Sequence, residues 1–139
     1  MSHPNVIPCF RYQDAPAAIE WLGKAFGAEP QLVVPGPAEG EIAHAQLRIG
    51  AGMIMLGSAG KHGNDFDALV TSVAEAGGRC TQTVYVVVED PKAHHDRAAA
   101  AGAEIVMPLE AKDYGGSGYG CRDLEGNVWS FGDFDPYAE

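Results

Sequence analysis

One stretch of this sequence places hydrogen-bonding side chains at every second position, which is the spacing of one face of a β-strand. In residues 41–49, His44, Gln46 and Arg48 alternate with apolar residues. A neutral imidazole in such a row can act as acid, base, hydrogen-bond partner or lone metal ligand. His44 is therefore the leading single candidate for chemistry, with a structural, hydrogen-bonded histidine as the equally weighted alternative.

The elements that would position these side chains follow one order twice. A strand, a helix and three strands are indicated in residues 5–57, and the same order returns in residues 81–133. Residues 58–80 form a linker, with a weaker helical segment near Phe66 to Ala76. The sequence thus predicts a single α+β domain of two repeated modules.

Both predicted helices begin at an acidic residue followed by proline, which are typical of helix starts. We expect one helix over Ala17–Phe26 and the other over Ala93–Ala101. Their prolines are 75 residues apart, as are the glycines that follow the two helices and Gly57 and Gly132. Such agreement on one spacing indicates a duplicated module, and coincidence in a chain rich in Ala and Gly is the alternative.

The composition excludes several partners. The chain has 139 residues and a formal net charge of -10, which repels nucleic-acid phosphate and anionic lipid. It shows no apolar run of membrane-spanning length and no signal-peptide pattern, so we expect a cytoplasmic protein. The three cysteines have no CxxC spacing, which favours free thiols over a disulfide framework or a zinc knuckle.

Four segments carry a recognisable pattern: Ile7–Asp14 leading to Ala18–Leu22, His44–Gly50, Tyr85–Asp90, and Arg122–Phe131. Together they resemble the vicinal oxygen chelate superfamily, which includes glyoxalase I, bleomycin-resistance proteins, extradiol dioxygenases and fosfomycin-resistance enzymes. In the fourth segment Leu124 stands where the family's turn usually has proline. The resemblance implies two βαβββ modules in tandem that form a curved, cup-like mixed sheet with helices outside and a ligand inside. It also implies a homodimer.

Metal-dependent relatives hold a divalent ion with His and Glu on the first and last strand of each module. On this chain those positions fall at Ile7 or Pro8, Met55, Gln82 or Thr83, and Ser130. None of these side chains is a carboxylate or imidazole, the donors that such an ion needs. We therefore expect no metal and no cofactor, unless the site has moved, for instance to His44.

Strand alternation and the 75-residue offset predict which side chains line the cup. The offset places Tyr119 and Cys121 opposite His44 and Gln46, and the mixture of thioethers, rings and hydrogen-bonding groups suits a small molecule. The Gly-rich loop 113–118 is either a flap that carries Tyr114 or an ordinary surface loop. The predicted ligand-binding residues are His44, Gln46, Met53, Met55, Thr83, Tyr85, Tyr114, Tyr119, Cys121 and Ser130.

Four further residues are interpreted as structural. The pair His94-His95 is expected on a solvated helix face, because adjacent helical positions point about 100° apart and cannot easily grip one metal. The pair Arg122-Asp123 is expected to fix the turn before the last strand.

The sequence favours a metal-free protein that binds or sequesters a small organic ligand, with catalytic residues unassigned. The resemblance to bleomycin-resistance proteins and the acidic balance favour a cationic or amphipathic ligand, although the same charge serves solubility. The alternative is a lyase, isomerase or dioxygenase with a relocated metal, or with His44 and Tyr119 as base and acid.

Overall fold

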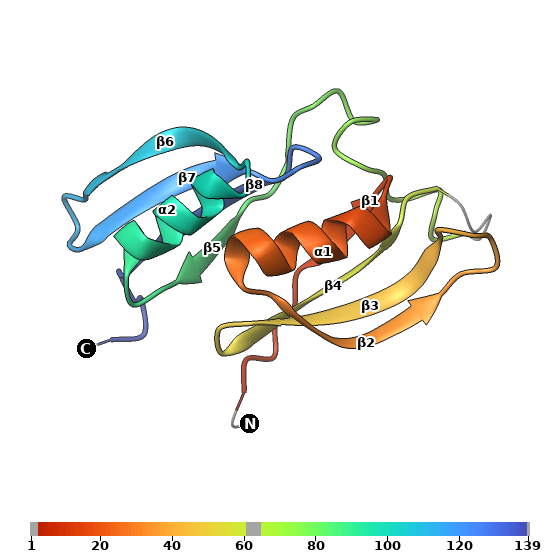
Figure 1. The fold of residues 1–139 in the computed structure, drawn as a ribbon, viewed down its shortest axis with the longest axis horizontal. Coiled ribbons are helices and arrows are strands. Elements are labelled where there is room, and N and C mark those ends of the chain that lie inside the picture. The colour runs from red at the N-terminus through yellow and green to blue at the C-terminus, as the bar shows by residue number, and fades with distance from the viewer. Residues whose placement is uncertain (1–2, 61–64, 139) are drawn as a thin grey trace.

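A computed structural model describes residues 3–60 and 65–138. The chain folds into two βαβββ modules in tandem (Figure 1). Module 1 comprises β1 (Cys9–Tyr12), α1 (Ala15–Phe26), β2 (Glu29–Pro35), β3 (Ile42–Ile49) and β4 (Gly52–Ser58). Module 2 comprises β5 (Val84–Val87), α2 (Pro91–Ala100), β6 (Glu104–Ala111), β7 (Ser117–Arg122) and β8 (Val128–Gly132).

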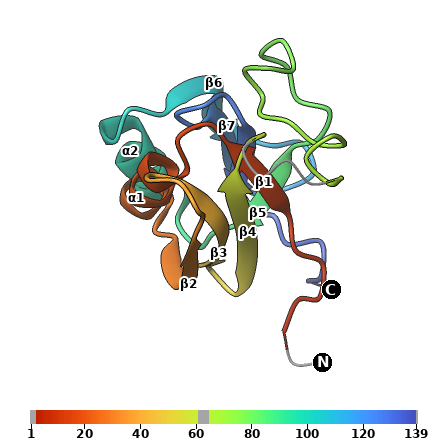
Figure 2. The ribbon, with the colours of Figure 1, turned by 90° about the vertical axis from the view of Figure 1, so that its right-hand side faces the viewer.

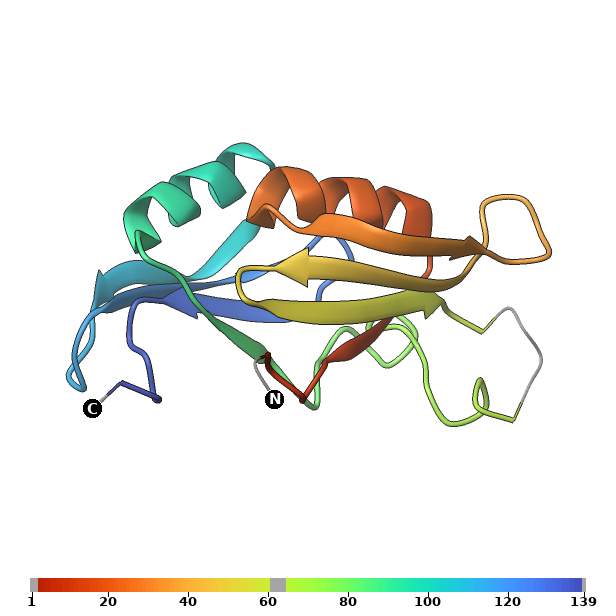
Figure 3. The same ribbon diagram turned by 90° about the horizontal axis from the view of Figure 1, so that it is seen from below.

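Each module forms its own four-stranded mixed sheet, in the order β1-β4-β3-β2 and β5-β8-β7-β6. The first strand of each sheet pairs in parallel with the last, and the other pairs are antiparallel. Both helices lie on the same side of the molecule, above the two sheets (Figure 3). The predicted α+β class with paired modules is confirmed, and the structure adds that the two sheets stay separate and do not close.

The acidic caps predicted for both helices are confirmed, and each helix starts two residues earlier than predicted, at Ala15 and Pro91. The side chains of Asp14 and Asp90 each accept a hydrogen bond, from the amides of Ala17 and Ala93, at 3.1 Å in both cases. These bonds satisfy amide groups that have no partner within the helix. Gly27 ends α1 at a φ of 74°, in the left-handed region that favours glycine.

Two predicted segments differ in the structure. The stretch from Phe66 to Ala76 forms turns and no helix, because its apolar residues are too scattered to bury a stripe against the sheets. Strand β6 runs from Glu104 to Ala111, four residues beyond Met107, where the residue types alone predict the strand to end. Pro108 is tolerated within it because β6 is an edge strand, where a missing amide costs no ladder bond.

One hydrophobic core joins the modules on the helix side. The rings of Phe26 on α1 and Trp129 on β8 have centroids 5.0 Å apart, and Phe10 on β1 stacks on Trp129 at 5.1 Å. Trp129 and Phe131 are fully buried. In the described part of the chain, neither helix has the length and apolar character that crossing a bilayer requires.

Each helix also donates side-chain hydrogen bonds to carbonyl groups at the C-terminal end of the other helix. The Trp21 indole on α1 donates to the carbonyl of Ala101 at 2.8 Å. In return the Arg97 guanidinium on α2 donates to the carbonyls of Gly23 and Lys24 at 3.0 and 2.9 Å. The last carbonyls of a helix have fewer intrahelical partners, and the Gly23 carbonyl also accepts the amide of Gly27 at 3.1 Å, so this exchange stabilises both helix ends.

A second inter-module contact lies at the turn between β7 and β8. The buried Asp123 carboxylate accepts hydrogen bonds from the Tyr12 hydroxyl at 2.6 Å and the Trp129 indole at 3.1 Å. It also accepts the amides of Glu125 and Asn127 at 3.0 Å each, which confirms that Asp123 fixes this turn. The Glu125 carboxylate in turn accepts the amides of residues 13 and 14, ahead of α1. We call these contacts of Asp123 and Glu125 the clasp.

Candidate functional site

The face of each sheet that points away from the helices is called the open face (Figure 2). In module 1 the strand register places His44, Gln46 and Arg48 there from β3, and Met53 and Met55 from β4. Gln46 lies opposite Met55, and Arg48 lies opposite Met53. Alternation along a strand therefore predicted this half of the open face correctly.

The polar groups of β3 are connected to one another. The Gln46 amide nitrogen lies 3.0 Å from His44 Nε2, and its amide oxygen accepts a hydrogen bond from Gln31 at 3.0 Å. Because an amide N–H can only donate, His44 Nε2 is the acceptor in this contact. The three side chains therefore form one connected hydrogen-bonding row across β2 and β3.

Arg11 is an open-face residue that the sequence reasoning missed. It lies on β1 opposite Gly57, and its guanidinium carbon stands 5.2 Å from the centre of the Phe66 ring. Because Gly57 has no side chain, the guanidinium can lie flat against the sheet there. The alternation of β1 contained the signal, since Arg11 is two residues from Cys9 and so shares its face.

The prediction for β7 is wrong by one residue. Leu56 matches Phe131 at the offset of 75, but their strand partners, Ala45 and Tyr119, are 74 residues apart. Five residues separate Arg122 from its partner in β8, whereas four separate the matching pair in module 1. A shift of one residue moves every side chain of a strand to the other face. Tyr119 and Cys121 therefore point toward the helices, away from the open face.

Both displaced residues are buried in the shared core. The Tyr119 hydroxyl lies 2.6 Å from His94 Nδ1 on α2, so His94 is packed against the sheet and not on a solvated helix face as predicted. Burial raises the pKa of the Cys121 thiol to about 12, with a smaller contribution from Asp123. A thiol with such a pKa is not a nucleophile at neutral pH. His44 and Tyr119 lie on opposite sides of the sheets, so they cannot act together as base and acid.

On the open face of module 2, glycines occupy the positions that carry polar side chains in module 1. Gly118 and Gly120 occupy the β7 positions that match His44 and Gln46, and Gly118 is paired with Gly132 on β8. Tyr85 and Ser130 lie on this face as expected and are paired with each other. Larger side chains lie over these glycines. Tyr85 lies beside Gly132, and Met107 lies beside Gly120.

The remaining predicted residues lie at the margin of this face. Tyr114 is in the tight turn between β6 and β7, where its ring contacts Phe134 edge-on at 5.0 Å. Thr83 is exposed and immediately precedes β5. Tyr85, Tyr114, Phe134 and Pro136 line one apolar hollow of about 270 Å³, which we call the aromatic pocket. Phe134 and Pro136 were missed, because no strand periodicity covers the segment after β8.

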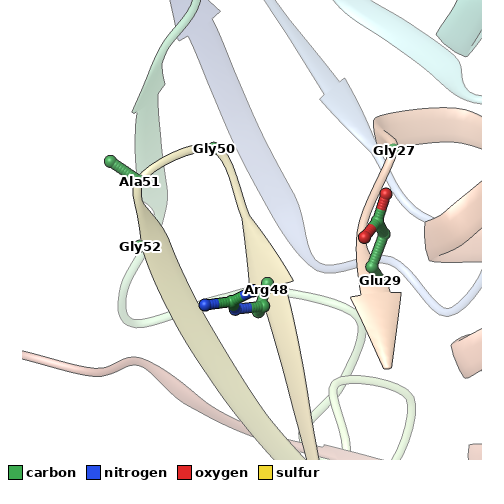
Figure 4. Close-up of a pocket in the computed structure, with 6 residues that line it drawn as sticks. All are labelled: Gly27, Glu29, Arg48, Gly50, Ala51 and Gly52. Carbon is green, nitrogen blue, oxygen red and sulfur yellow. The ribbon is translucent and has the colours of Figure 1, made fainter. Parts of the chain in front are cut away.

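A larger hollow, of about 380 Å³, lies at the tip of the β3–β4 hairpin. Figure 4 shows the Glu29 carboxylate directed toward Gly27, and the Arg48 guanidinium directed away from it, across β4. The other lining residues are Gly50, Ala51 and Gly52, so backbone forms most of the wall. Of the predicted ligand-binding residues, none lines this hollow.

The corners where metal-dependent relatives hold an ion do not fit one here. The first-strand residues opposite Met55 and Ser130 are Cys9 and Tyr85, and not the expected Ile7 or Pro8 and Gln82 or Thr83. A thiol, a thioether and two hydroxyls therefore stand where those relatives have carboxylate and imidazole donors. Within residues 3–60 and 65–138, moreover, no three His, Cys, Asp or Glu side chains gather as a metal site would need.

The model of the glyoxalase/bleomycin resistance protein/dioxygenase superfamily matches residues 6–131. The chain belongs to this superfamily. An uncharacterised protein of Mycobacterium tuberculosis strain H37Rv is 33% identical over 135 residues, which are 93% of this chain and 74% of the relative. A protein of Mycobacterium bovis is also 33% identical over 135 residues, covering 93% of this chain and 82% of that relative.

Two solved structures show a similar fold. TioX from Micromonospora sp. ML1 is 36% identical, with a TM-score of 0.72 over 95% of this chain and 98% of its own. The fosfomycin resistance protein FosX from Listeria monocytogenes, in complex with Mn(II) and sulfate, is 12% identical, with a TM-score of 0.66 over 98% and 94%. At that identity the second likeness supports the fold alone.

Proposed function

We propose that this superfamily member binds a small organic molecule on its open face and sequesters it without a resident metal. The main observation behind this proposal is that the open face has two surfaces of different chemistry, one polar and one aromatic. Module 1 offers the connected hydrogen-bonding row of Gln31, Gln46 and His44, and module 2 offers the aromatic pocket. Apolar walls with a few fixed polar groups are the usual composition of a small-molecule site.

The proposal rests on the residues whose side chains lie on or beside the open face. Tyr119 and Cys121 are withdrawn from the set, because they are buried under the helices. Arg11, Met107 and Phe134 are added. The retained residues are His44, Gln46, Met53, Met55, Thr83, Tyr85, Tyr114 and Ser130.

Sequestration fits the chemistry of this face better than catalysis does. The residues at the family's metal corners are unsuited to a divalent ion, and the one acid–base pair considered, His44 with Tyr119, is divided by the sheet. Binding alone requires no such pair. The remaining route to catalysis is a metal held around His44, and stoichiometric metal lost on chelation with loss of activity would support it.

We further propose a homodimer in which a second copy covers part of the open face. Outside the aromatic pocket the sheets leave apolar side chains uncovered there, including Val87 and Met107 at 44% and 54% exposure. A second copy is the occupant that the resemblance to the superfamily implies. Light scattering at several protein concentrations tests the proposal, and a monomer at every concentration would refute it.

The binding proposal is tested by a ligand screen that reports on position. Methyl-labelled Met53, Met55 and Met107 lie on the open face, and NMR shifts of their methyl groups on ligand addition would place the ligand there. Recovery of the ligand unchanged by mass spectrometry separates sequestration from turnover. A Gln46→Leu variant should weaken binding about tenfold, because it removes the central member of the polar row. Gln13→Leu, an exposed change in the turn ahead of α1, is the control.

A further inference from the structure

The aromatic pocket is built from three separate parts of the chain. Tyr85 comes from β5, Tyr114 from the turn between β6 and β7, and Phe134 and Pro136 from the segment after β8. The rings of Tyr114 and Phe134 have centroids 5.0 Å apart and planes inclined by 70°. Two rings at nearly a right angle, with a third beside them, form an open box.

The rings of this box remain accessible. Tyr85, Tyr114 and Phe134 are 42%, 62% and 37% exposed. Single exposed apolar residues are common on protein surfaces, but an adjacent group of exposed rings is typical of a binding site. Their exposure means that a ligand can reach the ring faces without displacing any other part of the described chain.

Hydrogen bonds hold the box in place before any ligand arrives. The Tyr85 hydroxyl donates to the carbonyl of Phe134 at 2.6 Å, which ties β5 to the segment after β8. The Asp133 carboxylate accepts the amide of Ser117 at 2.7 Å, which ties that segment to β7. The turn that carries Tyr114 is closed by a bond from the amide of Lys112 to the carbonyl of Gly116 at 2.8 Å. A preformed box loses less conformational entropy on binding.

Aspartates neighbour the rings of the box in the chain. Asp113 precedes Tyr114 in the chain, and Asp133 and Asp135 flank Phe134. The pKa of Tyr85 is raised by burial first, then by Tyr114 and by the charges of Asp133 and Asp135, so both carboxylates act at the box. The cation near this turn, Lys112, stands 3.6 Å from the Glu110 carboxylate. The surroundings of the box are therefore acidic.

We propose that the aromatic pocket binds the alkylammonium head group of an organic cation. Aromatic faces carry partial negative charge and attract a cation, and a trimethylated ammonium offers methyl groups to several rings at once. The carboxylates of Asp133 and Asp135 supply long-range attraction, which a neutral ligand of the same shape would not feel. This inference rests on the proposed small-molecule function and names the ligand class that module 2 selects.

The test compares choline with 3,3-dimethyl-1-butanol, which has the same shape without the charge. Each compound is titrated into ¹⁵N-labelled full-length protein, and the affinity is taken from the amide shifts of residues 85, 114 and 134. We expect choline to bind about tenfold more tightly than the neutral compound. Asp133→Asn combined with Asp135→Asn should reduce that preference to about threefold or less, while the affinity for the neutral compound stays unchanged.

The matched ring variants are Tyr114→Leu and Tyr137→Leu. Tyr114 lines the pocket, whereas Tyr137 is 94% exposed and is not among its lining residues. Tyr114→Leu should lower the affinity for choline about tenfold, and Tyr137→Leu should leave it unchanged. Unaltered amide spectra elsewhere show that each variant is folded.

The outcomes separate this inference from the function on which it rests. Equal affinities for choline and the neutral compound, both lost in Tyr114→Leu, would overturn the cation assignment and leave the small-molecule site standing. An equal loss of affinity for choline in Tyr114→Leu and Tyr137→Leu would also overturn the cation assignment. If neither compound binds and the ligand screen places nothing on the open face, the proposed function itself fails.

Discussion

The two modules share a topology but present different chemistry on the open face. At matching positions of their central strands, module 1 has His44 and Gln46, whereas module 2 has Gly118 and Gly120. The cause is a turn that is longer by one residue, which changes the face on which the side chains of β7 lie. A duplicated fold can thus acquire two binding surfaces through the length of a turn, with no change in strand order.

The largest expected effect concerns this longer turn. Asp123→Ala leaves the Tyr12 hydroxyl, the Trp129 indole and two amides without their acceptor in a buried region. Since each buried unsatisfied group costs about 1–3 kcal/mol, we expect the free energy of unfolding to fall by about 3–5 kcal/mol.

Urea unfolding measures this loss, and Ala51→Ser in the short turn of module 1 is the control. Ala51 is exposed, so its substitution should change stability by less than about 0.5 kcal/mol. If Asp123→Ala costs no more than the control, the clasp does not join the modules energetically.

The second prediction compares the matched glycines of the two last strands. A Cβ atom on Gly132 would stand 2.8 Å from the carbonyl oxygen of Ser117, which belongs to the backbone and cannot move freely. On Gly57 it would chiefly meet the end of the Arg11 side chain, which can move, with the Ala43 carbonyl at 3.0 Å. We expect Gly132→Ala to cost about 1–3 kcal/mol and Gly57→Ala about half as much. Thermal unfolding of the two variants decides, and the reverse order would contradict this comparison.

The third prediction concerns the dependence of stability on pH. At the offset of 75 residues, the titratable His94 of α2 matches the apolar Ile19 of α1. Burial, and to a lesser extent Arg97, lowers the pKa of His94 to about 4. The folded state therefore favours the neutral imidazole. Its contribution to stability is complete above the unfolded pKa of about 6.5 and is lost as the pH falls toward 4.

Unfolding free energies at pH 7 and pH 4.5 test this effect. The partial exposure of His94 screens its charge, so we expect it to account for about 1–2 kcal/mol of the difference. His94→Asn keeps a hydrogen-bonding group near Tyr119 and removes the titration, so its stability should depend less on pH. His3→Asn, an exposed change, should retain the full dependence. Parallel pH profiles for wild type and His94→Asn would rule out this role.

The smallest expected effect lies at the helix ends. Trp21→Phe keeps an aromatic ring against Phe26 and removes the hydrogen bond to the Ala101 carbonyl. We expect a loss of about 0.5–1.5 kcal/mol in the free energy of unfolding, as for one hydrogen bond. Glu20→Gln, its neighbour on α1, is the control, and an equal loss there would show that the indole bond contributes nothing.

Local patterns predicted most of the fold because each element carries its own signal. Asp14 and Asp90 mark the helix starts, and alternation in residues 42–49 marks the face that carries His44. The facing of Tyr119 could not be obtained this way, because it depends on one residue in a turn, and hydrophobic patterning is weak in a glycine-rich strand.

The site was predictable only where it lies on strands. Phe134 and Pro136 belong to an irregular segment, which is placed by the hydrogen bonds of Tyr85 and Asp133 and not by any periodicity. Residues brought together by such tertiary contacts leave no pattern in a single sequence. The aromatic pocket therefore became visible only in three dimensions.

The clasp has a consequence for how the chain folds during its synthesis. Tyr12 and Asp123 are 111 residues apart. The beginning of α1 therefore leaves the ribosome long before the turn between β7 and β8, which binds it, is synthesised. Until then the nascent first half must expose the surface of Phe10 and Phe26 that Trp129 later covers. Variants that slow translation between the modules would prolong this unprotected interval, and their damage would fall on soluble yield while the finished protein stayed equally stable.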